Sequence, residues 1–122
     1  MAKVLVAESN TDLQQFIQAC LTAAGHDVTV VPDGAAALAT ATLTRPDLCI
    51  LDVTHGVDVC QALRGDPATA LSPIMIVTSM MDVLDLDDAL ACGADEYLVK
   101  PFSPRNLLTH VARLLARVTD PV

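Results

Sequence analysis

The chain has 122 residues, a formal net charge of −8 and a hydrophobic fraction of 52%. Its length suits one domain with a single core, and its apolar runs are far shorter than the ~20 residues that cross a bilayer, so a soluble globular protein without a membrane partner is expected. Seven basic residues against fifteen acidic ones argue against nucleic acid as a partner, because affinity for a duplex comes largely from Lys and Arg side chains that neutralise phosphates.

The start of the chain and its thiols indicate a cellular compartment. The first three residues lead straight into a short apolar run and not into the long one of a signal peptide, so the cytoplasm is the expected location. Four cysteines lie in apolar surroundings without close spacing, and they are Cys20, Cys49, Cys60 and Cys92. This pattern favours free thiols that pack as small hydrophobic side chains over a zinc site or a disulfide framework.

Five short runs rich in Val, Ile and Leu alternate with five amphipathic segments along the chain. The runs predict strands at 3–7, 27–31, 47–51, 74–77 and 96–99. The alternation is typical of a doubly wound α/β domain, a parallel sheet covered by helices on both faces. The first helix is expected to close at Gly25, and Pro104 suits the first turn of the last one. The domain is expected to cover residues 1–118, followed by a short tail at 119–122.

Polar residues stand where four of the predicted strands end. They are Glu8, Asp52, Thr78 and Lys100. In an open parallel sheet the ligand crevice lies outside the carboxyl ends of the strands, so we expect these side chains to share one pocket. Asp52 is the most informative of them, because a carboxylate at the end of a buried strand is seldom there for packing.

The stretch Gly-Ala-Asp-Glu-Tyr-Leu-Val-Lys-Pro-Phe at residues 93–102, preceded by Thr78, resembles the receiver domain of two-component response regulators. The likeness runs from Lys3 to about Arg117. It implies a CheY-like, five-stranded sheet with the flavodoxin-like strand order 2-1-3-4-5. It also implies that Asp52 accepts a phosphoryl group and that Lys100 binds the phosphate.

The resemblance assigns further roles around Asp52. Glu8 and the main-chain carbonyl of Thr54 would complete a divalent-metal site with Asp52, Thr78 would be the switch hydroxyl, and Tyr97 the switch aromatic. Magnesium is the expected cofactor, because it prefers oxygen ligands and is usually held by one or two carboxylates together with phosphate oxygens. Phosphoryl transfer depends mostly on positioning and on electrostatic stabilisation, which a metal and a fixed cation supply.

Two departures from the family pattern concern the metal. Ser9 stands where a second metal-binding aspartate is typical, so weaker magnesium binding is expected, since a charge about 4 Å from the ion is lost. Ser9 is expected to cap the first helix instead, with Asn10 or Thr11 as the other candidates, and Thr11 with Gln14 has the spacing of a capping box. The loop after Asp52 is shortened by about four residues, judging by helix register.

The sequence thus predicts a phosphorelay receiver, a signal-transduction phosphoprotein and not an enzyme. Its partners would be a histidine kinase or phosphotransfer protein and a downstream protein target, and it would be a monomer or weak homodimer. The first alternative is a pseudo-receiver that acts as a docking or dimerisation module without phosphorylation. The second is a flavodoxin-like small-ligand binder, which the single Tyr, the absence of Trp and the lack of a glycine-rich phosphate loop disfavour.

Overall fold

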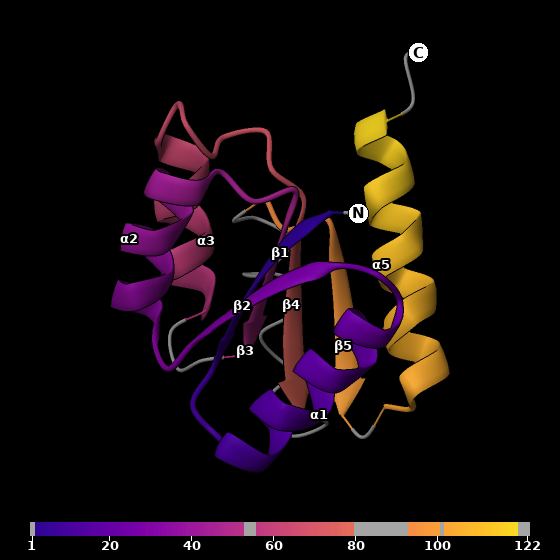
Figure 1. Ribbon diagram of the computed structural model, residues 1–122. Coiled ribbons are helices and arrows are strands. Elements are labelled where there is room, and N and C mark those ends of the chain that lie inside the picture. Colours follow the sequence, from indigo (N-terminus) through magenta and orange to yellow (C-terminus); the bar gives the residue numbers. More distant parts are fainter. Residues whose placement is uncertain (1, 53–55, 80–92, 101, 120–122) are drawn as a thin grey trace.

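The computed structural model describes residues 2–52, 56–79, 93–100 and 102–119, which form a parallel sheet between two layers of helices (Figure 1). The strands are β1 (Lys3–Glu8), β2 (Asp27–Val31), β3 (Leu48–Asp52), β4 (Ile74–Ser79) and β5 (Glu96–Lys100). Their order is β2-β1-β3-β4-β5, and every pairing is parallel. The predicted doubly wound fold and its strand order are confirmed.

Four helices are described, and they are α1 (Thr11–Ala23), α2 (Gly34–Thr44), α3 (Gly56–Gly65) and α5 (Pro104–Thr119). The remaining predicted amphipathic segment falls within residues 80–92, outside the described part of the chain. Helices α2 and α3 cover one face of the sheet, and α1 and α5 cover the other (Figure 1). No helix in the described ranges is long and apolar enough to cross a membrane.

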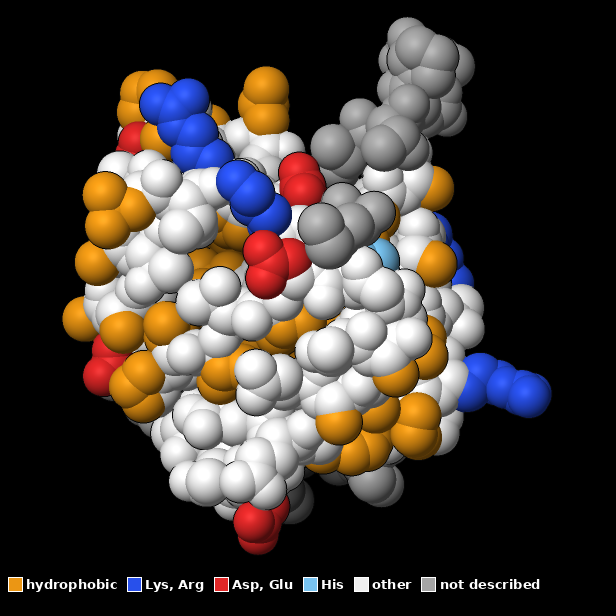
Figure 2. Space-filling model, viewed as in Figure 1, with side chains coloured by type: hydrophobic (Ala, Val, Ile, Leu, Met, Phe, Trp, Pro, Cys, Tyr) orange, Lys and Arg blue, Asp and Glu red, His pale blue; other side chains and the backbone are white. Residues whose placement is uncertain are grey.

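The core consists of two apolar clusters separated by the sheet. Successive residues of a strand point to opposite faces, so Leu5 joins the cluster under α2 and α3 while Val4 and Val6 join the one under α1 and α5. Both faces of the sheet are covered, which explains why the central strands read as continuous apolar runs. On the face shown in Figure 2, the remaining hydrophobic side chains reach the surface in separate patches.

The start of α1 differs from the expectation. Asn10 is the N-cap residue, and its side-chain Oδ1 accepts a hydrogen bond from the Leu13 main-chain N–H at 3.0 Å. Ser9 is exposed and lies before the cap, so the expectation that it caps the helix is wrong, and Asn10, one of the two alternatives, is confirmed. The predicted capping box of Thr11 and Gln14 is also absent. The cap position is occupied by Asn10. The Gln14 side chain instead donates a hydrogen bond to the main-chain oxygen of Glu8.

Other local predictions are confirmed. Gly25 follows α1 with φ +93°, a left-handed conformation that glycine adopts without steric cost, and α5 begins at Pro104. Cys20, Cys49 and Cys60 form no disulfide within the described part of the chain, and the last two are buried. Burial raises the pKa of the Cys49 thiol to about 12, as expected of a packed and unreactive cysteine.

Arg64, near the end of α3, joins three segments through its guanidinium group. Its Nε donates to the main-chain oxygen of Gly93 at 2.9 Å. One terminal nitrogen donates to the carbonyls of Ala70 at 3.0 Å and Ser72 at 2.5 Å, and the other lies 2.7 Å from Asp95 Oδ2. This clamp holds α3, the connection to β4 and the connection to β5 together.

The clamp explains the first residues of the motif that carries the family resemblance. Gly93 has φ +94°, and a Cβ placed on it would lie 3.2 Å from Arg64 Nε, so the turn leaves little room for a side chain. Asp95 Oδ2 also accepts a hydrogen bond from the Ile74 main-chain N–H at 2.8 Å, at the start of β4. The Gly-Ala-Asp part of the motif therefore serves the fold and positions β5.

Close packing of α2 against α3 depends on Gly34. A Cβ placed there would lie 2.5 Å from Val59 Cγ2, so we expect Gly34→Ala to lower the free energy of unfolding by about 1–3 kcal/mol, the usual cost of overpacking. Chemical denaturation of the purified protein would measure this loss. A Gly34→Ala/Val59→Ala double variant should be less affected than the two single losses summed, because the clash is gone.

Gly65 provides the matched control for this experiment. It is exposed, and a Cβ on it would meet no atom within 4 Å. Gly65→Ala is therefore expected to be neutral or to stabilise the protein by up to about 1 kcal/mol. Equal stability of Gly34→Ala and Gly65→Ala would contradict the packing described for α2 and α3.

Candidate functional site

The ends of β1, β3 and β5 bring three of the predicted site residues together. Glu8 and Asp52 are the last residues of adjacent parallel strands and are directly paired in register. Lys100 ends β5, which is separated from β3 by β4, and its Nζ lies 2.5 Å from Asp52 Oδ2. All three belong to their strands, because the ladder continues one residue further than the apolar runs suggest.

Glu8 carries an unusual carboxyl group for a strand end. The residue is 2% exposed, its Oε1 accepts a hydrogen bond from the Asn10 main-chain N–H at 2.9 Å, and its Oε2 is buried with no hydrogen-bond partner among the described residues. Burial and the neighbouring Asp52 carboxyl raise the pKa of Glu8 to about 7, although the Asn10 N–H and the Lys100 charge favour the ionised form. This side chain therefore keeps its proton to a higher pH than an ordinary glutamate does.

Asp52 and Lys100 form the charged centre of the site. Their side chains are 14% and 35% exposed, so both can be approached from solvent. Asp52 Oδ2 is buried and has no hydrogen bond of acceptable geometry in the described ranges, which makes the contact with Lys100 an ion pair. The site thus presents a carboxylate beside a fixed cation, an arrangement suited to a phosphoryl group.

The other predicted site residues are placed less fully. Thr78 lies in β4, paired with Val99 of β5, and its side chain lies outside what the structure describes. Tyr97 is half buried on β5, pairs with Ile76 and packs against the cluster under α2 and α3. Thr54 and the shortened loop fall in residues 53–55, outside the described residues.

Two residues near Glu8 have roles that sequence reasoning did not find. The main-chain N–H of Asn10 holds Glu8 Oε1, and the side-chain amide of Gln14 donates to the Glu8 main-chain oxygen. The only signal in the sequence is the pattern of polar residues at a helix start, which predicts capping and gives no sign of a contact with the strand end.

The donor set fits a magnesium ion. Glu8 and Asp52 are adjacent, and Glu8 Oε2 is buried with no hydrogen bond in the described structure, whereas Asp52 Oδ2 is paired with Lys100. An uncompensated buried carboxylate oxygen is costly, and a hard divalent cation with oxygen preference would relieve that cost. Ser9 is exposed and adds no charge, so these two carboxylates are the acidic groups that would hold the ion.

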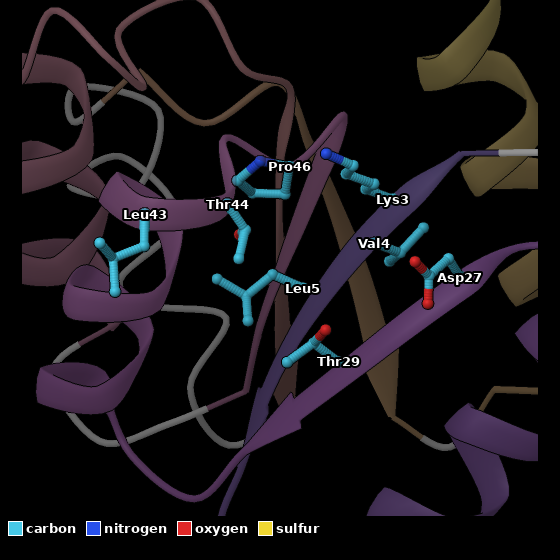
Figure 3. Close-up of a pocket in the computed structure, with 8 residues that line it drawn as sticks. All are labelled: Lys3, Val4, Leu5, Asp27, Thr29, Leu43, Thr44 and Pro46. Atoms are coloured by element: carbon cyan, nitrogen blue, oxygen red, sulfur yellow. The ribbon is translucent and has the colours of Figure 1, made fainter.

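A separate pocket lies at the opposite ends of the strands. Figure 3 shows it beside the amino ends of β1 and β2. Its volume is about 330 Å³. Lys3, Asp27, Thr44 and Pro46 are among the residues that line it. None of Glu8, Asp52 and Lys100 contributes to it, so this pocket is separate from the candidate site.

Comparison with known proteins supports the geometry. Residues 4–112 match the family model described as response regulator receiver domain. The DNA-binding response regulator MtrA of Mycobacterium tuberculosis is 35% identical over an alignment of 122 positions, which covers 97% of this chain and 52% of that protein. The chain therefore spans about half the length of the curated relatives it matches.

Two solved structures have the same fold. The chemotaxis response regulator CheY4 of Vibrio cholerae has a TM-score of 0.87 and 33% identity, over 93% of this chain and 98% of that one. The receiver domain of the sensor histidine kinase PA1611 of Pseudomonas aeruginosa has a TM-score of 0.86 and 28% identity, over 94% and 98% of the two chains. The latter was solved with a magnesium ion coordinated in its active-site cleft.

One expectation about partners is wrong. The excess of acidic residues predicts that nucleic acid is not a partner, yet relatives that match 97% of the chain are named DNA-binding response regulators. The charge count describes these 122 residues alone, whereas the relatives are about twice as long. The net charge of one domain therefore does not exclude a nucleic-acid partner for the proteins in which such a domain occurs.

Proposed function

Because this chain belongs to the response regulator receiver domain family, we propose that it accepts a phosphoryl group on Asp52 from a histidine kinase or a phosphotransfer protein. The observation that carries the proposal is the 2.5 Å ion pair between Lys100 Nζ and Asp52 Oδ2, next to the buried Glu8 carboxyl. An ion pair at a strand end, open to solvent on one side, provides an acceptor and a fixed counter-charge for phosphate.

In the proposed reaction a carboxylate oxygen of Asp52 attacks the donor phosphorus. A bond forms between that oxygen and phosphorus, the bond from phosphorus to the donor's leaving atom breaks, and the leaving group keeps the electron pair. Lys100 balances negative charge on the phosphoryl oxygens, which is the main contribution a protein makes to such a transfer. Glu8 and Asp52 would hold a magnesium ion, which would supply further positive charge for the transfer.

The output of the domain is a two-state change of surface. We propose that Thr78 donates a hydrogen bond to the phosphoryl group and that Tyr97 changes position in response, which biases the surface of β5 and α5 towards a partner-binding state. Tyr97 is half buried against the core, so a change in its side-chain position alters both packing and surface. By likeness to the relatives named DNA-binding, the switch would control a DNA-binding activity.

Intact-mass measurement after incubation with acetyl phosphate and magnesium tests the acceptor. The wild type is expected to gain the mass of one phosphoryl group, and Asp52→Asn is expected to gain none, because an amide oxygen is a poor nucleophile. Asp27→Asn is the matched control, since Asp27 is exposed at the amino end of β2, the opposite end of the strands from the site, and it should be modified like the wild type. An adduct that persists in Asp52→Asn would place the acceptor elsewhere.

The exposed Ser9 favours a second candidate, a pseudo-receiver that docks a partner without phosphorylation. Ser9 contributes no charge, and the remaining pair includes Glu8, whose pKa is raised to about 7, so both metal affinity and the acceptor reaction would be weak. No adduct on the wild type, under conditions that modify an ordinary receiver, would favour this candidate over the first.

A further inference from the structure

A small hydrogen-bond network fixes the segment that joins β1 to α1. The main-chain N–H of Asn10 donates to Glu8 Oε1 at 2.9 Å. Gln14 contacts the same segment twice, because its main-chain N–H donates to the Asn10 oxygen at 2.9 Å and its side-chain Nε2 donates to the Glu8 main-chain oxygen. Glu8 is therefore held both by its backbone and by its carboxylate.

The network leaves one oxygen of Glu8 available. Oε1 is occupied by Asn10, while Oε2 is buried beside Asp52 and has no hydrogen-bond partner among the described residues. The Glu8 main-chain oxygen belongs to a residue that is 2% exposed, so it needs the partner that Gln14 supplies. Without the Gln14 side chain this oxygen would lose its partner, and the end of β1 that carries the Glu8 carboxylate would be held less firmly.

We propose that Gln14 is a positioning residue for the divalent cation, acting together with the Asn10 main-chain N–H. The pair holds the Glu8 carboxylate so that Oε2 alone is presented beside Asp52. This inference rests on the proposed function, because it concerns the same metal site. A carboxylate that is already held in place loses less conformational freedom when the ion binds. This gain matters here because Ser9 adds no charge to those of Glu8 and Asp52.

Isothermal titration calorimetry with magnesium chloride tests the role of Gln14. Gln14→Met keeps the length of the side chain and removes its donor, and is expected to weaken magnesium binding roughly threefold to tenfold, the worth of one neutral hydrogen bond. Gln15→Met is the matched control, because Gln15 is exposed on the next position of α1, and its affinity should equal that of the wild type. A lower unfolding midpoint for Gln14→Met with unchanged affinity would show a purely structural role and overturn the proposal.

A second pair of variants tests the same idea through Asn10. Asn10→Ala and Asn10→Pro both remove the capping side chain, but only proline also removes the N–H that holds Glu8 Oε1. The φ of −86° at this position is close to the range of proline. We expect magnesium to bind Asn10→Pro roughly threefold more weakly than Asn10→Ala. Equal affinities would overturn the proposal.

Phosphorylation measured on the same preparations separates the two claims. A phosphoryl adduct on the wild type, with magnesium binding to Gln14→Met as tight as to the wild type, overturns the positioning role and leaves the proposed function standing. A wild type without an adduct overturns the proposed function, and a weaker magnesium affinity of Gln14→Met in that protein still supports the positioning role.

Discussion

Replacing Glu8 with glutamine is expected to make the metal-free protein more stable above neutral pH, although the change removes a side chain from the candidate site. Glu8 is 2% exposed, and its burial beside Asp52 raises its pKa from 4.5 to about 7. Each tenfold change in the ionisation constant corresponds to about 1.4 kcal/mol. The protein with ionised Glu8 therefore has a free energy of unfolding about 3 kcal/mol lower than the protein with protonated Glu8. Glutamine carries no charge and can donate a hydrogen bond to Asp52.

The effect has a defined pH window. The folded protein holds the Glu8 proton more tightly than the unfolded chain, so between pH 4.5 and about 7 the folded state carries more protons and the free energy of unfolding falls as pH rises. The stabilisation that comes from the tightly held Glu8 proton is fully present below pH 4.5 and is lost above about pH 7. Glu8→Gln should therefore match the wild type at the acidic end and exceed its stability by about 3 kcal/mol at the alkaline end.

Urea denaturation across this window, in the presence of a chelator, measures the difference between the two proteins. The other charged residues are the same in both proteins, so the difference reports on Glu8 and its interaction with Asp52. Asp27→Asn, at an exposed position of β2, is the control and should follow the wild type at every pH. Parallel curves for the wild type and Glu8→Gln would show that Glu8 is not the buried acid described above.

Magnesium should reverse the order of stability. An ion that binds the folded protein alone stabilises it by an amount that grows with its concentration over its dissociation constant. Above about pH 7 the wild type presents two ionised carboxylates to the ion, whereas Glu8→Gln presents one. We therefore expect added magnesium to raise the unfolding midpoint of the wild type and to leave that of Glu8→Gln nearly unchanged.

Arg64→Met is expected to cost about 3–4 kcal/mol in the free energy of unfolding, the largest loss among the substitutions considered. The variant leaves the carbonyls of Gly93, Ala70 and Ser72 and the carboxylate of Asp95 without their donor. The side chains of Arg64 and Asp95 are only 21% and 32% exposed, so water replaces these bonds incompletely.

Equilibrium denaturation measures this loss, and two further variants sharpen it. Arg64→Lys keeps the charge but not the planar fork of donors, so an intermediate loss is expected. Arg105→Met, at an exposed position of α5, should stay within about 0.5 kcal/mol of the wild type. If Arg64→Met and Arg105→Met unfold at the same denaturant concentration, the clamp does not stabilise the fold.

The strands and their order follow from the sequence because both faces of the sheet are covered. Continuous apolar runs then mark the strands directly, and β2 has the bounds that its pattern predicts. The runs are less informative about strand ends. Glu8, Asp52 and Lys100 are polar, yet each remains in the hydrogen-bonded ladder, since the backbone pairs regardless of the side chain.

Features that depend on contacts between distant segments are not visible in the sequence. The choice of Asn10 over Ser9 as the cap depends on where β1 ends, and the raised pKa of Glu8 depends on the burial that the completed sheet provides. Arg64 shows no pattern at all, because its partners lie up to 31 residues away along the chain. The resemblance identifies Gly93 and Asp95 without giving the physical reason for them.

The central sheet also separates the protein into two layers of packing whose residues can vary independently. Leu21 and Leu63, for example, are both fully buried. Leu21 belongs to the cluster between the sheet and helices α1 and α5, and Leu63 to the cluster between the sheet and helices α2 and α3. Residues that share no partners contribute to stability nearly additively. One helical layer can therefore accumulate substitutions, and adapt its outer surface to a new partner, while the packing of the other layer stays as it was.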